Sequence, residues 1–299
     1  MIETINVSKS YENIKAIDNI SIEIKEGAVF GLIGTNGAGK STFLRMIAGI
    51  LKCDEGSIKI DGMDVFENIE AKSRFFYISD EQYFMQSATP LDMMKFYEST
   101  YENYNTQRFY ELLDKFSLDC NRKINTFSKG MKKQLSIVLG LCAGTKYLLC
   151  DETFDGLDPV MRQAVKSIFA AEMVDRDFTP IIASHNLREL EDICDHVGLL
   201  HKGGVILSRE LADMKENIHK IQCVLKEGVE SDIFAALDVV NLEKRGSLYT
   251  LTARGDRDEI LKHINESEPV FIEALPLSLE EIFISETGGV GYDIKKIIF

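Results

Sequence analysis

The segment 34–42 has residue types and a spacing that suit phosphate binding. It comprises Gly34, Thr35, Asn36, Gly37, Ala38, Gly39, Lys40, Ser41 and Thr42. The segment matches the pattern of Gly, four residues, then Gly-Lys-Ser, in which glycines let backbone N–H groups approach phosphate oxygens closely. The Lys40 ammonium can reach the β- and γ-phosphates, and the Ser41 hydroxyl can ligate Mg²⁺. The sequence therefore predicts a nucleotide-phosphate site, with a chance match in a glycine-rich turn as the alternative.

Acidic residues and a histidine at the ends of apolar runs could complete such a site. Asp151 and Glu152 follow the run 147–150, and His185 follows the run 180–184. Beside a phosphate loop, the Asp can hold Mg²⁺ directly or through water, and the adjacent Glu can polarise an attacking water. Each alone could be a surface group, but downstream of the phosphate loop we interpret them as catalytic.

These residues need a fold that brings the ends of several strands to one edge of a sheet. The apolar run 28–33 predicts a strand before the loop, and 43–48 predicts the first turns of a helix after it. Strand, glycine loop and helix direct backbone N–H groups and the positive helix end at an anion. Strands alternating with helices predict an α/β fold with a largely parallel sheet, in which ligands bind at the carboxyl ends of the strands.

Other patterns surround this core. Alternation over 2–7 and 16–24, and the glycine-bounded segment 56–62, predict further strands. From about residue 84 the sequence has helical spacing and is rich in Phe, Tyr and Met, which predicts a helical subdomain over about 84–140. Most of these side chains are expected to form the subdomain's own core. A docking surface for a partner is the alternative, because exposed aromatic and Met side chains favour interfaces.

The pattern restarts after about residue 217. Strand-like and helical segments follow one another at 220–225, 232–237, both sides of 246–247, 257–264 and 270–274. The order β-α-β-β-α-β predicts a small α+β domain, ferredoxin-like in topology. We therefore divide the chain into 1–217 and an accessory domain at 218–299.

Composition restricts the class of protein. The chain has 299 residues and a formal net charge of -14, which argues against nucleic acid as the main partner because that needs a basic face. The six cysteines are scattered without metal-ligand spacing, which favours a reducing cytoplasm over a disulfide framework. The sequence has no apolar run of about 18 residues, so it predicts no membrane-spanning helix.

One more motif precedes the apolar helix predicted at 135–143. Ser128 is placed as its N-cap, where neighbouring N–H groups could bind an anion. Read locally, this is only a helix start. In combination with the other motifs, the chain resembles the ATP-binding subunit of ATP-binding-cassette (ABC) transporters, of the bacterial single-cassette exporter (ABC-2) type, over residues 1 to about 215.

The resemblance rests on motifs in the family's order. Segment 34–42 resembles Walker A, and 148–152 resembles Walker B. The remaining matches are the signature loop Ser128, Lys129, Gly130 and Met131, the D-loop Asp158, the switch histidine His185 and the adenine-stacking Tyr11. More weakly, 277–283 resembles the C-terminal accessory region of such exporters.

The resemblance implies a P-loop NTPase of the ABC cassette fold, with a RecA-like α/β core, an antiparallel β subdomain and a helical subdomain. It implies ATP and Mg²⁺ as cofactors, with the metal held by Ser41 and Asp151. Hydrolysis would use Glu152 on water, His185 on the γ-phosphate and Lys40 on the developing charge. Two cassettes, identical or different, would pair head to tail, with the signature loop completing the partner's site.

The implied assembly is peripheral on the cytoplasmic face of the cell membrane, attached to a separate multi-spanning permease subunit that selects the substrate. Its cytoplasmic helix is expected to dock near residues 75–110. One alternative is a soluble cassette ATPase that acts on a non-membrane partner such as the ribosome. Another is a nucleotide switch without turnover.

The sequence departs from the family's usual pattern at several positions. Lys129 stands where Gly is commonest, and Thr153 stands where Pro is usual. Asp80 occupies the place of a Gln that touches Mg²⁺, and Gln82 comes two residues later. Asp80 is therefore a candidate metal ligand, and the residue that replaces the Gln is left open.

Overall fold

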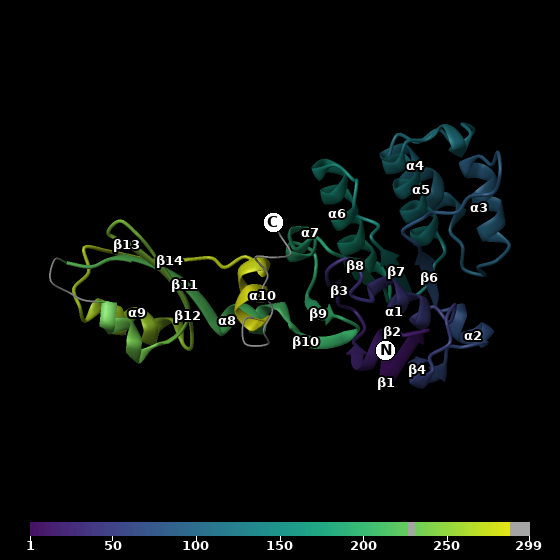
Figure 1. The fold of residues 1–299 in the computed structure, drawn as a ribbon. Helices are drawn as coiled ribbons and strands as arrows, with labels where there is room; N and C mark the ends of the chain where they lie inside the picture. The colour runs from purple at the N-terminus through teal and green to yellow at the C-terminus, as the bar shows by residue number, and fades with distance from the viewer. Residues whose placement is uncertain (227–230, 288–299) are drawn as a thin grey trace. The chain divides into compact units, whose positions relative to one another are not determined.

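The computed structural model describes residues 1–226 and 231–287, in two compact units, Met1–Ser208 and Arg209–Phe299 (Figure 1). The boundary expected at residues 217/218 lies further along, at the amino end of a strand of the second unit. The parts of the expected accessory domain at 227–230 and 288–299 lie outside the described residues.

The first unit contains an antiparallel sheet of order β2-β1-β4-β5. Its strands are β1 (Ile2–Tyr11), β2 (Ile14–Ile24), β4 (Glu55–Ile60) and β5 (Met63–Asp64). Ile2 on β1 pairs with Ile24 on one side and Ile60 on the other, so that the buried isoleucines share one face. This face is the apolar half of the alternation seen in the sequence.

A six-stranded sheet of order β10-β9-β3-β8-β7-β6 forms the rest of the core. Its strands are β3 (Phe30–Ile33), β6 (Phe75–Ile78), β7 (Tyr147–Asp151), β8 (Thr179–Ser184), β9 (His196–His201) and β10 (Gly204–Glu210). The pairs β6–β7, β7–β8, β8–β3 and β3–β9 are parallel. The central strands β3, β7 and β8 are buried throughout, which explains their continuous apolar runs.

Helix α1 (Lys40–Ile47) joins the two sheets. It begins directly after the glycine loop and packs against β7 and β8 as well as β2 and β4. Phe43 and Leu44 of α1 belong to one apolar core that includes residues of both sheets. The amino end of α1 is therefore held at the carboxyl edge of the parallel sheet, where the predicted site residues lie.

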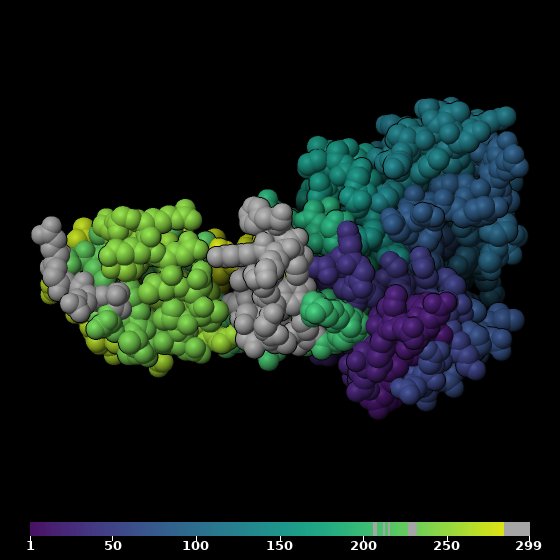
Figure 2. Space-filling view, viewed as in Figure 1, coloured from purple at the N-terminus to yellow at the C-terminus, as the bar shows by residue number. Residues whose placement is uncertain are grey.

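Helices between β6 and β7 form a separate layer, visible beside the sheets in Figure 1 and as the blue-to-teal surface in Figure 2. They are α3 (Pro90–Glu98), α4 (Thr106–Lys115), a 3₁₀ turn (Ile124–Thr126) and α5 (Lys129–Cys142). Met93, Phe109 and Leu112 are buried among them, whereas Tyr83 and Phe96 are exposed. The segment thus has its own core and also presents aromatic side chains to solvent.

A buried ion network ties α4 to α6 (Pro159–Asp175). Arg108 on α4 donates to Glu172 Oε1 from both Nε (3.2 Å) and Nη2 (3.0 Å). Arg176 Nε donates to the other oxygen of Glu172 at 2.8 Å, and its Nη1 donates to the Thr145 carbonyl at 2.5 Å. Because Glu172 is only 8% exposed, this pairing is a specific connection between the helical segment and the sheet core.

The remaining helices of the first unit are short. They are α2 (Ile69–Lys72) and α7 (Leu187–Glu191). Asn68 is the N-cap of α2, and its side chain accepts from the Ala71 N–H. Asn186, directly after His185, is the N-cap of α7, so this helix sets the path of the chain past the histidine.

The second unit has a four-stranded antiparallel sheet of order β12-β13-β11-β14. Its elements are α8 (Leu211–Glu216), β11 (Ile218–Val224), a 3₁₀ helix (Ser231–Ala236), β12 (Asp238–Arg245), β13 (Leu248–Arg254), α9 (Arg257–Asn265), β14 (Phe271–Leu275) and α10 (Leu279–Thr287). Ile221, Leu251 and Ile260 lie in its core. Within the described part of the chain, no helix has the length and apolar character needed to cross a membrane.

Candidate functional site

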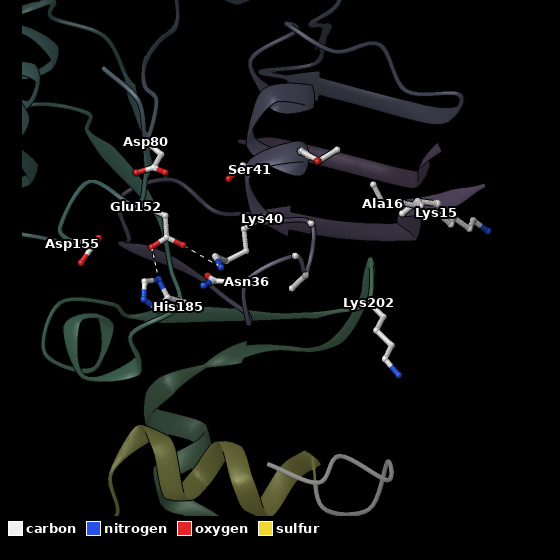
Figure 3. Close-up of a pocket in the computed structure, with 15 residues that line it drawn as sticks. Lys15, Ala16, Asn36, Lys40, Ser41, Asp80, Glu152, Asp155, His185 and Lys202 are labelled. Carbon is white, nitrogen blue, oxygen red and sulfur yellow. Dashed lines mark hydrogen bonds and ion pairs between the residues drawn. The ribbon is translucent and has the colours of Figure 1, made fainter. Parts of the chain in front are cut away.

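The phosphate loop, the ends of β7 and β8 and the start of β2 meet around a pocket of about 650 Å³ in the first unit (Figure 3). Its lining residues are Ile14, Lys15, Ala16, Asn36, Gly37, Ala38, Gly39, Lys40, Ser41, Thr42, Asp80, Glu152, Asp155, His185 and Lys202. Most of the predicted loop is therefore at the pocket wall, together with the predicted acid and histidine.

The loop has the conformation that its glycines permit. Gly37 has φ 80° and Gly39 has φ 104°, both in the left-handed region. A Cβ at Gly39 would lie 2.5 Å from the Ala16 carbonyl oxygen, so only glycine lets β2 approach here. Gly39 is the N-cap of α1 and offers no side-chain acceptor, which leaves the first N–H groups of the helix to bind an anion.

Lys40 is 5% exposed and reaches back across the loop. Its Nζ donates to the Gly34 carbonyl at 2.7 Å and to the Thr35 carbonyl at 3.3 Å. The same Nζ lies 3.1 Å from Glu152 Oε1. Gly34 and Thr35 thus hold Lys40 through their carbonyls and do not line the pocket themselves.

Glu152 stands between a lysine and a histidine, as Figure 3 shows. Besides its contact with Lys40, its Oε2 lies 2.9 Å from His185 Nδ1. Glu152 follows β7 directly, and His185 follows β8, its parallel neighbour. The two side chains meet because parallel neighbouring strands end at the same edge of the sheet.

Asp151 is fully buried beside the loop. Its Oδ1 accepts from Ser41 Oγ at 2.9 Å and its Oδ2 accepts from the Tyr77 hydroxyl at 3.2 Å. Burial raises the pKa of Asp151 above its usual value, against the opposite effect of these hydrogen bonds. Burial, followed by the Asp151 charge, also raises the pKa of Tyr77.

The donor set suits Mg²⁺ bound together with phosphates. Ser41 lines the pocket, and its hydroxyl lies next to a carboxylate oxygen of Asp151, which is buried behind the pocket wall and does not line it. Over residues 1–226 and 231–287, no cluster of three or more His, Cys, Asp or Glu side chains could hold a metal ion without other ligands. Mg²⁺ typically takes one or two protein oxygens and fills its octahedron with water and substrate phosphates.

The surroundings of Asp80 differ from those expected for a Gln that contacts the metal. Asp80 lines the pocket, and its Oδ1 lies 3.9 Å from Lys133 Nζ. The Gln82 side chain turns back on its own loop, donating to the carbonyls of Ser79 (3.2 Å) and Asp80 (2.8 Å). Of these two candidates, only Asp80 therefore faces the pocket.

Several predicted residues lie away from the pocket wall. Tyr11 is at the exposed end of β1, with Lys9 Nζ 5.9 Å from its ring centroid, and the adjoining wall is made by 14–16 instead. Ser128 caps α5 by accepting from the Met131 N–H at 3.2 Å. Tyr11 and Ser128 do not line the pocket, and neither do Lys129 and Gly130.

The D-loop residue Asp158 acts as a helix cap in this chain. Its Oδ1 accepts from the Met161 N–H at 2.9 Å, at the start of α6. It does not line the pocket, whereas Asp155, three residues earlier, does. The sequence analysis did not single out Asp155, because it stands in a loop with no periodic pattern.

A buried carboxylate that the sequence analysis missed holds the loop around His185. Glu189 on α7 accepts from Ser184 Oγ at 3.0 Å and from Asn186 Nδ2 at 3.1 Å, on either side of the histidine. Arg162 on α6 donates to it at 3.3 Å. In the sequence, only the position of Glu189 on a short helix after His185 indicates that it could hold this loop.

The chain is similar to known proteins in sequence. The family model described as ABC transporter matches residues 17–155. The chain is 30% identical to the ABC transporter ATP-binding protein YtrB of Bacillus subtilis (strain 168), covering 97% of this chain and 99% of YtrB. It is 31% identical to the bacitracin transport ATP-binding protein BcrA of Bacillus licheniformis, covering 69% of this chain and 68% of BcrA.

Solved structures resemble a large part of the chain. One, described as the ATP binding subunit of an ABC transporter, has a TM-score of 0.67 at 26% identity and covers 72% of this chain and 92% of its own. Another, the dimeric bacterial cassette MJ0796, has a TM-score of 0.64 at 22% identity, covering 71% and 99%. The expected cassette fold is thereby confirmed.

Proposed function

The chain belongs to the ABC transporter ATP-binding proteins, and we propose that within this family it powers export through a separate membrane subunit. Its activity as an ATP-binding ATPase subunit follows from the family. What remains to be assigned is the role of each residue, the assembly and the direction of transport.

In the proposed mechanism, Glu152 is the general base that polarises the attacking water, and His185 orients it and contacts the γ-phosphate. The observation that carries this assignment is the position of the Glu152 carboxylate, 3.1 Å from Lys40 Nζ and 2.9 Å from His185 Nδ1. Lys40 and the N–H groups of α1 bind the phosphates and stabilise charge that develops on them. Mg²⁺ held at Ser41 and Asp151 would supply further charge neutralisation.

We propose that a second cassette completes the site. Ser128, Lys129, Gly130 and Met131 stand at the start of α5 and do not line their own chain's pocket, which supports a role toward the nucleotide of a partner. A head-to-tail pair of two copies is the simplest assembly, and a different cassette is the other outcome. Mass measurement of the ATP-bound complex separates the two.

The permease is proposed to dock on the surface formed by residues 75–110. Tyr83 is 82% exposed there, and Met85 and Phe96 are also accessible to solvent. A second pocket of about 810 Å³ includes Tyr101 and Lys146 in its lining. Exposed aromatic and Met side chains favour an interface with a partner. We accordingly place the subunit at the cytoplasmic face of the membrane.

The second unit is proposed to be an accessory domain of ferredoxin-like topology. The sheet order β12-β13-β11-β14 supports this, because it is the order that a β-α-β-β-α-β unit adopts. We assign it a role in dimerisation or regulation, since the residues proposed for hydrolysis all lie in the first unit.

Substitution of Glu152 by Gln tests the mechanism. The Glu152→Gln variant should bind ATP and lose turnover, and it should accumulate an ATP-bound dimer visible by size-exclusion chromatography. Glu70→Gln is a matched control, because Glu70 is an exposed carboxylate on α2. Equal ATPase rates in Glu152→Gln and wild type would contradict the assignment of the base. The ribosome alternative is not favoured, because YtrB and BcrA are transporter subunits.

A further inference from the structure

A buried lysine on α5 contacts the backbone of the proposed catalytic base. Lys133 is 8% exposed, and its Nζ donates to the Glu152 carbonyl oxygen at 2.6 Å. Within residues 1–226 and 231–287, the acidic side chain that pairs with this ammonium is Asp80, which is 3.9 Å away and 54% exposed. Burial of an ammonium costs free energy unless the group has polar partners. The Glu152 carbonyl is such a partner and helps to offset the cost of burying Lys133.

The backbone of Glu152 needs to be held. Its φ of 48° lies in the left-handed region, which costs free energy for a residue with a side chain. The Glu152 N–H donates to the Ala183 carbonyl at 3.0 Å, and the Glu152 carbonyl accepts from Lys133. Both polar groups of this residue are thereby fixed, one by β8 and one by α5. Its carboxylate is in consequence directed at Lys40 and His185.

We propose that Lys133 is a positioning residue for ATP hydrolysis, acting through the Glu152 carbonyl to hold the carboxylate of the base in its catalytic direction. The inference rests on the proposed function of Glu152 as the base. Asp80 has a secondary part, because its partly solvated carboxylate attracts the same ammonium from 3.9 Å. This gives Asp80 a structural partner at the position where the family has a Gln.

The position of Lys133 also links two sites. Ser128, in the loop proposed to contact the partner's nucleotide, is the N-cap of helix α5, and Lys133 lies on the next turn of the same helix. A helix moves as a rigid element, so a displacement of Ser128 is transmitted to Lys133 and hence to the Glu152 carbonyl. The base of one site is in this way coupled to the nucleotide held by the other cassette.

Lys133→Met tests the proposal on the full chain, because Met keeps most of the length and removes the donor. We expect kcat for ATP hydrolysis to fall between about 10-fold and 100-fold, the size of effect expected when a catalytic group is misplaced by about 1 Å. The KM for ATP should stay within about twofold, because the phosphate loop is untouched.

Two further variants separate positioning from a structural role. Lys133→Arg keeps a cationic donor and should recover most of the turnover. Lys115→Met, an exposed lysine at the end of α4, is the matched control and should behave like wild type. Thermal unfolding and binding of a non-hydrolysable ATP analogue verify folding. If Lys133→Met loses analogue affinity and Lys133→Arg restores no turnover, the role is structural and the proposal is overturned.

Failure of this proposal is distinguishable from failure of the proposed function. Unchanged kcat in Lys133→Met with an inactive Glu152→Gln overturns only the positioning role. Full activity in Glu152→Gln removes the base itself, and the positioning role with it. In single-turnover measurements, Lys133→Met should add no loss to Glu152→Gln, because both act on one group. Additive losses would show that Lys133 acts elsewhere.

Discussion

Lys40 Nζ lies 3.1 Å from Glu152 Oε1, so the proposed phosphate-binding lysine and the proposed base form an ion pair. Both side chains are largely buried, at 5% and 13% exposure, and the pair is therefore weakly screened. A γ-phosphate bound by the loop must compete with this carboxylate for the same ammonium. Nucleotide binding and the orientation of the base are consequently linked by electrostatics.

Removal of the charge from Glu152 should therefore strengthen ATP binding while it abolishes turnover. We expect Glu152→Gln to bind a non-hydrolysable ATP analogue about 3- to 10-fold more tightly, since 1.4 kcal/mol corresponds to tenfold. Isothermal titration calorimetry measures the change, with Glu70→Gln as the control. Weaker binding by Glu152→Gln would show that the carboxylate does not compete with the phosphate.

Truncation of Lys40 should have the opposite effect on affinity. In Lys40→Ala the loop loses the cation that Gly34 and Thr35 orient, and both ATP affinity and turnover should fall by about 100-fold or more. Equilibrium binding and steady-state ATPase assays check this. Lys52→Ala, an exposed lysine just after α1, should change neither quantity. Survival of both quantities in Lys40→Ala would contradict the phosphate site.

The ion network at Glu172 should stabilise the first unit. Glu172→Ala leaves Arg108 and Arg176 without their shared carboxylate, and we expect a loss of about 3 kcal/mol in the free energy of unfolding. Glu111 also pairs with Arg108 but is 47% exposed, so Glu111→Ala should cost no more than about 0.5 kcal/mol. Denaturant unfolding followed by fluorescence compares them. Equal costs would mean that burial does not matter here.

The second unit should show a pH-dependent contribution from Glu281. Burial acts to raise its pKa, but the Lys220 ammonium at 2.5 Å and the Ser278 N–H outweigh burial, so that the pKa lies below 4.5. Its stabilisation is therefore present above pH 4.5 and is lost as the pH falls through the lower, folded-state value. Glu281→Gln should melt at a lower temperature than wild type at pH 7.

That difference should shrink as the pH falls below 4.5 and Glu281 becomes protonated in the wild type. Differential scanning calorimetry at several pH values measures it. Glu273→Gln, at an exposed position on β14, is the control and should melt like the wild type throughout. A constant difference between Glu281→Gln and wild type at every pH would contradict an effect of ionisation.

Changes of charge on the proposed docking surface should separate hydrolysis from transport. Phe96 is 48% exposed on α3, and Phe96→Glu should abolish co-purification with the co-expressed permease while basal ATPase stays within about twofold, because an exposed substitution costs little stability. Val174→Glu is the control, because Val174 is an exposed apolar residue on α6, outside residues 75–110. Loss of ATP binding in Phe96→Glu would show that this face serves the nucleotide site.

Local sequence patterns were sufficient to predict much of the fold and of the candidate site. The spacing of glycines, lysine and serine over 34–42 predicted the loop, because close backbone approach to phosphate depends on residues adjacent in sequence. Apolar runs ending in Glu152 and His185 predicted strands ending in polar groups, because strand burial is read from composition. The ABC family and its cassette fold also followed from the order of these motifs.

The tertiary structure alone decided which distant groups meet. Tyr77 reaches Asp151 across 74 residues of sequence, and Lys133 reaches the Glu152 carbonyl across 19. Neither residue stands in a pattern that distinguishes it from an ordinary strand or helix position. Contacts of this kind depend on strand order and helix packing, which bring together side chains that no local sequence pattern connects. The sequence by itself therefore predicted the phosphate loop and determined the family, and the fold determined how the proposed base Glu152 is held.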